Sequence, residues 1–180
     1  MRIISGKHKS KRITAPKKLP VRPTTDMAKE ALFNILNNTY YFEDISFLYL
    51  FAGTGNISYE FASRGTKNIV SVDADYGCVK FIDKISMELD FGISTIKSDV
   101  FSFLGKSTLK VDVIFADPPY DLSTEDFAKI PELVFKNQML LDDGMLIIEH
   151  SKHTDLSSLD HFSNQRRYGG SVFSFFNHKD

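Results

Sequence analysis

The strongest constraint on the fold is an alternation of short apolar runs with helical patterns over residues 47–149. The runs are rich in β-branched and aromatic residues, as buried strands are, and the segments between them repeat apolar residues at helical spacing. Such alternation predicts an α/β fold with a mostly parallel, doubly wound sheet covered by helices on both faces. The expected strands are 47–51, 68–72, 93–97, 111–116 and 145–149, and the expected helices are 57–63, 77–89 and 125–136, with a short helical turn near 100–104.

The two ends of the chain depart from this alternation. Residues 165–170 are turn-like and residues 171–176 alternate as a strand, which predicts an antiparallel hairpin at the end of the sheet. Before the first strand, Thr24, Thr25 and Asp26 offer oxygens that can cap a helix. The face of this helix that we expect to be buried consists of Met27, Ala31, Leu32, Ile35 and Leu36, which recur at helical spacing.

Charge is distributed unevenly along the chain. Residues 1–22 contain eight of the 22 Lys and Arg residues and none of the 23 acids, so the remainder carries 14 bases against 23 acids. A basic segment on an acidic body points to a polyanionic partner such as nucleic acid, although a solvated, frayed terminus has the same composition. Ile3, Ile4 and Ile13, with a turn-like Ser5-Gly6, indicate a short β-hairpin that presents its bases in order.

Composition excludes several classes of protein. The 180 residues suffice for one domain with a sizeable core. The single Cys78 rules out an internal disulfide, and the five histidines show no metal-ligand spacing with Cys78 or with one another. No apolar run is long enough to cross a bilayer. We therefore expect a cytoplasmic protein without a metal or a membrane partner, and nothing in the sequence demands more than a monomer.

One apolar run, residues 111–116, ends directly in Asp117-Pro118-Pro119-Tyr120. The two prolines stop the strand, because neither can donate to a sheet ladder and each fixes φ. A carboxylate, carbonyls freed from the ladder and an aromatic ring remain at the strand end. This set can accept from the N–H groups of a planar amine and stack on its base. The alternative is a strand that merely ends, with Tyr120 packed on the surface.

A glycine turn and two acids follow the first three strands. Gly53-Thr54-Gly55 joins the first strand to a helix, and Asp73 stands 20 positions after Gly53, where ribose-binding acids usually lie. Ser58 occupies the place of the third glycine of a dinucleotide fingerprint, which favours a nucleoside cofactor without a diphosphate. Asp99 follows the third strand and is placed to accept from an adenine amino group. Helix capping is the alternative role for each acid.

These residues resemble a known pattern. The glycine turn, Asp73, Asp99 and the tetrapeptide stand in the order seen in class I S-adenosylmethionine-dependent methyltransferases of exocyclic amines. Nearly the whole chain resembles the RsmD family, bacterial enzymes that methylate the N2 amine of a guanine in small-subunit (16S) ribosomal RNA. The segments that carry the family resemblance are 2–6, 22–26, 30–36 and 50–55, together with Glu60, Ser63-Arg64-Gly65 and Arg167-Tyr168-Gly169.

The resemblance implies a Rossmann-like class I methyltransferase with a seven-stranded, mostly parallel sheet and an antiparallel C-terminal strand. Residues 1–22 would be a basic RNA-binding extension and residues 23–180 the methyltransferase domain. The partner would be ribosomal RNA or the assembling small subunit. S-adenosylmethionine would contact Phe51, Ala52, Gly53, Thr54, Gly55, Asp73, Ala74, Asp99, Val100 and Asp117. The catalytic set would be Asp117, Pro118, Pro119 and Tyr120, and the RNA would contact Arg2, Lys7, Lys9, Lys11, Arg12, Arg22 and Thr25.

Three other functions remain open. An adenine-N6 methyltransferase acting on DNA or RNA would use the same tetrapeptide on a different amine. A nicotinamide oxidoreductase could share the sheet, although the missing third glycine and the paired prolines argue against it. A non-catalytic RNA-binding module could retain the fold. The one departure that suggests it is Tyr49, which stands where family members usually carry an Asp that helps to hold the amino-acid end of the cofactor.

Overall fold

A computed structural model describes residues 1–22 and 24–179. Pro23, which belongs to the 22–26 motif and begins the expected main domain, and Asp180 lie outside the described residues. The helices are α1 (Asp26–Asn37), α2 (Asn56–Ser63), α3 (Tyr76–Glu88), α4 (Val100–Lys106) and α5 (Thr124–Lys136), with a short 3₁₀ turn at Phe42–Asp44. The strands are β1 (Ser46–Leu50), β2 (Asn68–Asp73), β3 (Ile93–Lys97), β4 (Val111–Ala116), β5 (Leu140–Ser151), β6 (Phe162–Tyr168) and β7 (Ser171–Asn177).

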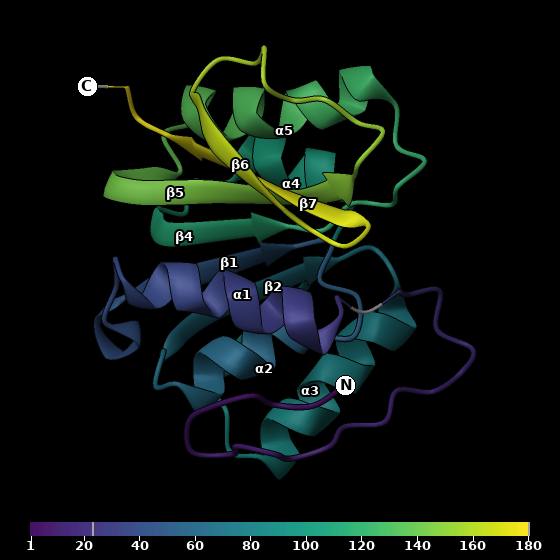
Figure 1. The fold of residues 1–180 in the computed structure, drawn as a ribbon. Coiled ribbons are helices and arrows are strands. Elements are labelled where there is room, and N and C mark those ends of the chain that lie inside the picture. Colours follow the sequence, from purple (N-terminus) through teal and green to yellow (C-terminus); the bar gives the residue numbers. More distant parts are fainter. Residues whose placement is uncertain (23, 180) are drawn as a thin grey trace.

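The strands form one seven-stranded sheet in the order β3-β2-β1-β4-β5-β7-β6 (Figure 1). Strands β1 to β5 pair in parallel, and β7 pairs antiparallel with both β5 and β6. The predicted mostly parallel sheet with an antiparallel C-terminal strand is therefore confirmed. The strand order reverses between β1 and β4, and in open α/β sheets ligands bind beyond the carboxyl ends of the strands at such a switch point.

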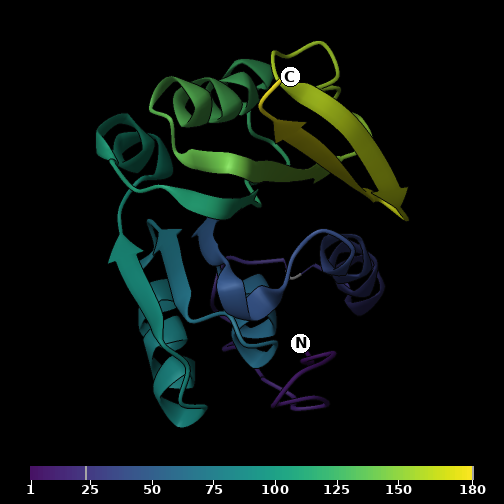
Figure 2. The same ribbon diagram turned by 90° about the vertical axis from the view of Figure 1, so that its left-hand side faces the viewer.

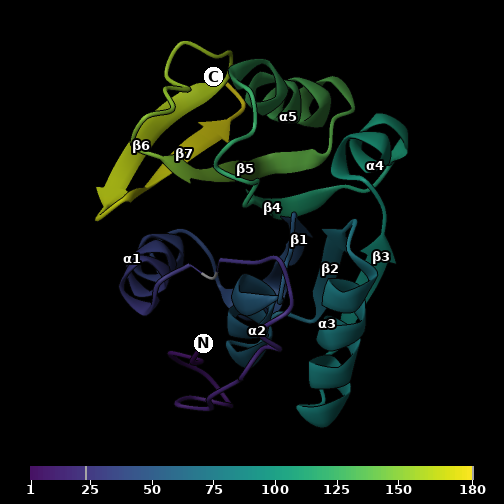
Figure 3. The same ribbon diagram turned by 90° about the vertical axis from the view of Figure 1, so that its right-hand side faces the viewer.

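Helices cover both faces of the sheet, as Figures 2 and 3 show from opposite sides. Residues alternate between the faces along each strand. Phe47 of β1 therefore packs in the core under α1, α2 and α3, whereas Leu48 and Leu50 pack in the core under α4 and α5. Apolar side chains on both faces explain why the strands appear in the sequence as continuous apolar runs.

Two expectations were wrong in detail. Residues 165–168 belong to strand β6 and not to a turn, which is confined to Gly169 and Gly170. Strand β6 is an edge strand and its side chains are largely exposed, so its polar sequence resembles that of a turn. In α1, Met27 is 63% exposed, and the buried residues are Ala28, Lys29, Leu32, Phe33 and Leu36. The buried stripe includes a lysine, which an apolar pattern does not reveal.

The basic segment is paired as a hairpin, but only through one antiparallel bridge, between Arg2 and Arg12. The Ile3 N–H donates to the Lys11 carbonyl at 3.0 Å, and the Ile13 N–H donates to the Met1 carbonyl at 3.0 Å. The Ile3 and Ile13 side chains are buried in the same core as α1 and α2. Although residues 1–22 differ from the remainder in charge, the hairpin packs on the rest of the chain and shares its core (Figure 1).

Candidate active site

A cleft of about 690 Å³ lies at the carboxyl ends of β1, β2, β4 and β5. Most of the residues expected at the cofactor and at the catalytic centre line it. They are Phe51, Ala52, Gly53, Thr54, Asp73, Ala74, Asp99, Val100, Asp117, Pro118, Pro119 and Tyr120. Gly55 lies in the turn but does not line the cleft. Of the expected RNA contacts, Arg22 and Thr25 line the cleft, whereas Arg2, Lys7, Lys9, Lys11 and Arg12 do not.

The turn after β1 requires its glycines. Gly53 and Gly55 have φ angles of +54° and +83°, and even Phe51 has a φ of +56°. A Cβ on Gly55 would lie 2.8 Å from the ring and hydroxyl of Tyr59, and one on Gly53 would lie 3.1 Å from Val21. The turn is therefore a tight cradle whose backbone faces the cleft without side chains in between.

Asp73 stabilises this turn as well as lining the cleft. Its Oδ2 accepts from the Gly53 N–H at 2.8 Å and its Oδ1 from the Asp75 N–H at 2.8 Å. The cap of α3 is Asp75, which accepts from the Cys78 N–H, so capping is not the role of Asp73. Asp99 both caps α4, by accepting from the Ser102 N–H at 2.9 Å, and lines the cleft.

The tetrapeptide begins where β4 leaves the sheet. The Asp117 N–H donates to the Leu50 carbonyl at 3.2 Å, which fixes the start of the tetrapeptide against β1. Burial and the nearby Glu149 carboxylate raise the pKa of Asp117 well above its usual range, and Arg22 partly offsets this. The Arg22 guanidinium lies 5.2 Å from the centre of the Tyr120 ring, within cation–π range. The Tyr120 hydroxyl lies 3.1 Å from the Ser171 hydroxyl.

Glu149 is a residue of the cleft that the sequence reasoning missed. It lies near the carboxyl end of β5, and it is 2% exposed. Its Oε2 accepts from the Thr24 hydroxyl at 2.7 Å, and its Oε1 accepts from the Tyr120 hydroxyl at 3.4 Å. The sequence contained a sign of this role, because Glu149 follows an apolar run in the same way as Asp73 and Asp117.

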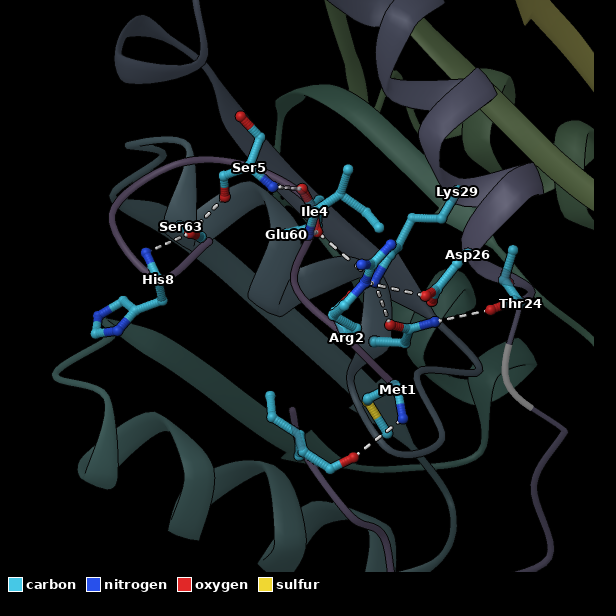
Figure 4. A network of polar contacts seen from close by, with 12 residues as sticks. Met1, Arg2, Ile4, Ser5, His8, Thr24, Asp26, Lys29, Glu60 and Ser63 are labelled. Carbon is cyan, nitrogen blue, oxygen red and sulfur yellow. Dashed lines mark hydrogen bonds and ion pairs between the residues drawn. The ribbon is translucent and has the colours of Figure 1, made fainter. Parts of the chain in front are cut away.

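A buried polar network connects the basic segment to α1 and α2 (Figure 4). Glu60 of α2 accepts from the Ile4 N–H at 2.9 Å and the Ser5 N–H at 3.0 Å, and it forms a salt bridge with Arg64. Lys29 of α1, 1% exposed, lies 3.6 Å from Glu60 and donates to the Asn56 side chain. Burial lowers the pKa of Lys29, although Glu60 opposes this.

This network anchors the backbone of the basic segment and leaves its charges outside. Gly6 rests on the backbone of Ser63, where a Cβ would lie 1.9 Å from the carbonyl oxygen. The eight basic side chains of the segment are all exposed, namely Arg2, Lys7, Lys9, Lys11, Arg12, Lys17, Lys18 and Arg22. The segment thus presents a fixed set of positive charges beside the main domain.

Within residues 1–22 and 24–179, no cluster of three or more His, Cys, Asp or Glu residues could hold a metal ion. None of the helices in this part of the chain is long and apolar enough to cross a membrane.

The fold and the cleft place the protein among the Rossmann-like class I methyltransferases. The chain resembles the solved structure of TTHA0928 from Thermus thermophilus, with a TM-score of 0.84 and 23% identity over 99% of both chains. It also resembles yhhF from Escherichia coli, with a TM-score of 0.82 and 26% identity over 98% of this chain and 96% of that one.

The family follows from sequence. The family model described as "Conserved hypothetical protein 95" matches residues 1–177. YlbH of Bacillus subtilis is 32% identical over 87% of this chain and 85% of its own length. Ribosomal RNA small subunit methyltransferase D of Escherichia coli K12 is 26% identical over 88% of this chain and 79% of its own length. The chain therefore belongs to this family, the RsmD family of methyltransferases.

Proposed function

We propose that this protein transfers a methyl group from S-adenosylmethionine to the N2 amine of a guanine in small-subunit ribosomal RNA. The observation that carries the proposal is the single cleft that joins the glycine turn after β1 to Asp117-Pro118-Pro119-Tyr120 after β4. Relatives named ribosomal RNA small subunit methyltransferase D support the RNA substrate. A 16S rRNA N2 G1207 methyltransferase from Thermus thermophilus, solved with AdoMet and guanosine, shares the fold at a TM-score of 0.70.

The residues of the cleft fit the proposed cofactor. The backbone at Gly53 is open to the cleft, and each Asp73 oxygen keeps a free lone pair for a ribose hydroxyl after accepting one backbone N–H. Asp99 is at the cleft wall for the adenine amine. S-adenosylmethionine, when bound, supplies an electrophilic methyl group on a positively charged sulfur.

The residues of the tetrapeptide orient the amine and take up its charge. Asp117 and the Pro118 carbonyl each accept a hydrogen bond from one N–H group of the amine. This arrangement turns the nitrogen lone pair toward the methyl group. Tyr120 stacks on the base. Once methylated, the amine nitrogen must lose a proton. Asp117 is placed to accept it, since burial and Glu149 raise its pKa.

Replacement of Asp117 tests this role. Asp117→Ala should lower kcat by about a thousandfold or more, because it removes an acceptor that acts on the transition state, and should leave S-adenosylhomocysteine affinity near wild type. The matched control is Asp121→Ala, an exposed acid one residue beyond the tetrapeptide, which should keep wild-type activity. More than a few per cent of activity in Asp117→Ala would rule out the assigned role.

The basic segment is proposed to bind the RNA backbone around the target base. If about four of its charges contact phosphates, the logarithm of the binding constant should fall against the logarithm of salt concentration with a slope near −3. A variant with Lys7, Lys9, Lys11 and Arg12 changed to Gln keeps the buried Ile3 and Ile13 and should lose most of this slope. The control changes Lys106, Lys110, Lys129 and Lys136, which are exposed elsewhere. If the salt dependence of binding has the same slope for both variants, the basic segment does not bind the RNA backbone.

The modified nucleoside distinguishes this function from adenine-N6 methylation. Unmodified small subunits are incubated with the protein and labelled cofactor, and the nucleosides are identified by mass spectrometry. N2-methylguanosine is expected, and N6-methyladenosine would replace the proposal by its rival. An RNA substrate of this kind would place the protein in the cytoplasm, where we propose that it acts as a monomer.

A further inference from the structure

Glu149 and Asp117 lie side by side at the carboxyl ends of β5 and β4, Glu149 within its strand and Asp117 directly after its own. Strands β4 and β5 are parallel, and their register pairs Ala116 with Ile148, so the residue that follows each of these two is an acid. Adjacent strands lie roughly 4.8 Å apart. Both carboxylates line the cleft. The mechanism above gives a substrate contact to Asp117 only.

The contacts of Glu149 leave it able to accept a further hydrogen bond from a ligand. Oε2 is anchored by the Thr24 hydroxyl at 2.7 Å. Oε1 accepts a long bond of 3.4 Å from the Tyr120 hydroxyl, which also contacts Ser171. A carboxylate oxygen can accept two donors, and no Lys or Arg in the described part of the chain forms a salt bridge with Glu149. Oε1 can therefore accept a further N–H from the cleft.

Burial and hydrogen bonds act in opposite directions on the carboxyl group of Glu149, and the net effect is a raised pKa. Burial raises its pKa, whereas the hydroxyls of Thr24, Ser171 and Tyr120 and the guanidinium of Arg22 favour the ionised form. An ionised carboxylate only accepts hydrogen bonds. Glu149 and Asp117 both line the cleft, and a carboxyl oxygen of each can accept an N–H from a ligand there.

We infer that Glu149 determines specificity for guanine by accepting its N1–H while Asp117 accepts from its N2 amine. The inference rests on the proposed function and adds the residue that selects guanine over adenine. Guanine presents N1–H and N2–H donors side by side. Adenine presents the N6 donors beside an N1 acceptor, which a carboxylate would repel. The two acids thus match guanine and reject adenine, a distinction that the tetrapeptide alone does not make.

The test uses 2-aminopurine, which keeps the amine at the same ring position but presents an unprotonated N1. Small-subunit RNA is ligated with 2-aminopurine at the guanine that the wild-type protein methylates. Wild type should favour guanine by about 10- to 100-fold in kcat/KM. Glu149→Gln, whose amide can donate to the unprotonated N1, should lose at least about tenfold of this preference. Quenching of 2-aminopurine fluorescence on binding with S-adenosylhomocysteine should show a corresponding gain in affinity.

Two matched variants separate specificity from structure. Asp121→Ala changes an exposed acid outside the cleft and should keep the wild-type ratio between the two bases. Glu149→Asp keeps a carboxylate and should keep the guanine preference even at a lower rate. Equal wild-type rates on the two bases, or a Glu149→Gln variant that slows both alike, would overturn the inference. Failure of the wild type to form N2-methylguanosine on unmodified subunits would overturn the proposed function as well.

Discussion

The Lys29–Glu60 pair allows an asymmetric prediction about stability. Glu60→Gln leaves the Lys29 ammonium, 1% exposed, without a carboxylate and removes an acceptor of the Ile4 and Ser5 amides. Breaking a buried pair in this way costs about 3–5 kcal/mol. Lys29→Met leaves Glu60 with Arg64 and two backbone donors and deprives mainly Asn56 and the Arg2 carbonyl of a donor. Its cost should be roughly 1–2 kcal/mol.

Denaturant titration of the two single variants and the double variant measures the difference. The double variant should be no less stable than Glu60→Gln, because removal of the lysine also removes the uncompensated charge, so the cycle should show a coupling of about 2 kcal/mol. The reasoning would be refuted if the two single variants lost equal unfolding free energy and the loss in the double variant were the sum of the two.

The pH dependence of Glu60→Gln provides a second readout. In the folded variant the pKa of Lys29 lies below its ordinary value of 10.5, because burial lowers it and Glu60 no longer raises it. The unfolded chain therefore binds more protons between these two pKa values. The free energy of unfolding should rise with pH in that window, by at most about 1.4 kcal/mol per pH unit. If the difference in unfolding free energy between this variant and wild type does not change with pH, Lys29 is not the buried charge that lost its partner.

Two further predictions concern Asp117 and the glycine turn after β1. Because burial and Glu149 raise the pKa of Asp117 and the sulfonium favours its ionised form, S-adenosylmethionine should lose affinity relative to S-adenosylhomocysteine as pH falls through that pKa; calorimetry that shows equal pH dependence for both ligands would contradict this. Gly55→Ala should cost roughly 2–4 kcal/mol in denaturant titration, because its φ is +83° and the new Cβ meets Tyr59. Gly105→Ala, in α4 with nothing within 4 Å, should be neutral or slightly stabilising.

The sequence predicts the central strands and the position of the cleft for a physical reason. Buried parallel strands need continuous β-branched runs, and polar residues that end such runs gather at one edge of the sheet, as Asp73, Asp99 and Asp117 do. The misses have equally definite causes. Lys29 is buried because Glu60 and Asn56 satisfy its charge, and such partners are distant in sequence. Strand β6 is polar because it lies at an edge, where no second neighbour excludes water.

Tyr49 can be understood from the charge of its surroundings. Its ring is buried at the floor of the cleft, edge-on to Phe115. Burial raises the pKa of its hydroxyl, and the nearby carboxylates of Asp117, Glu149 and Asp73 raise it further. An Asp at position 49 would add another buried negative charge to that group at a cost in desolvation and repulsion. A neutral hydroxyl avoids this cost while offering both a donor and an acceptor, so Tyr49 is compatible with a cleft that already contains the Asp117–Glu149 pair.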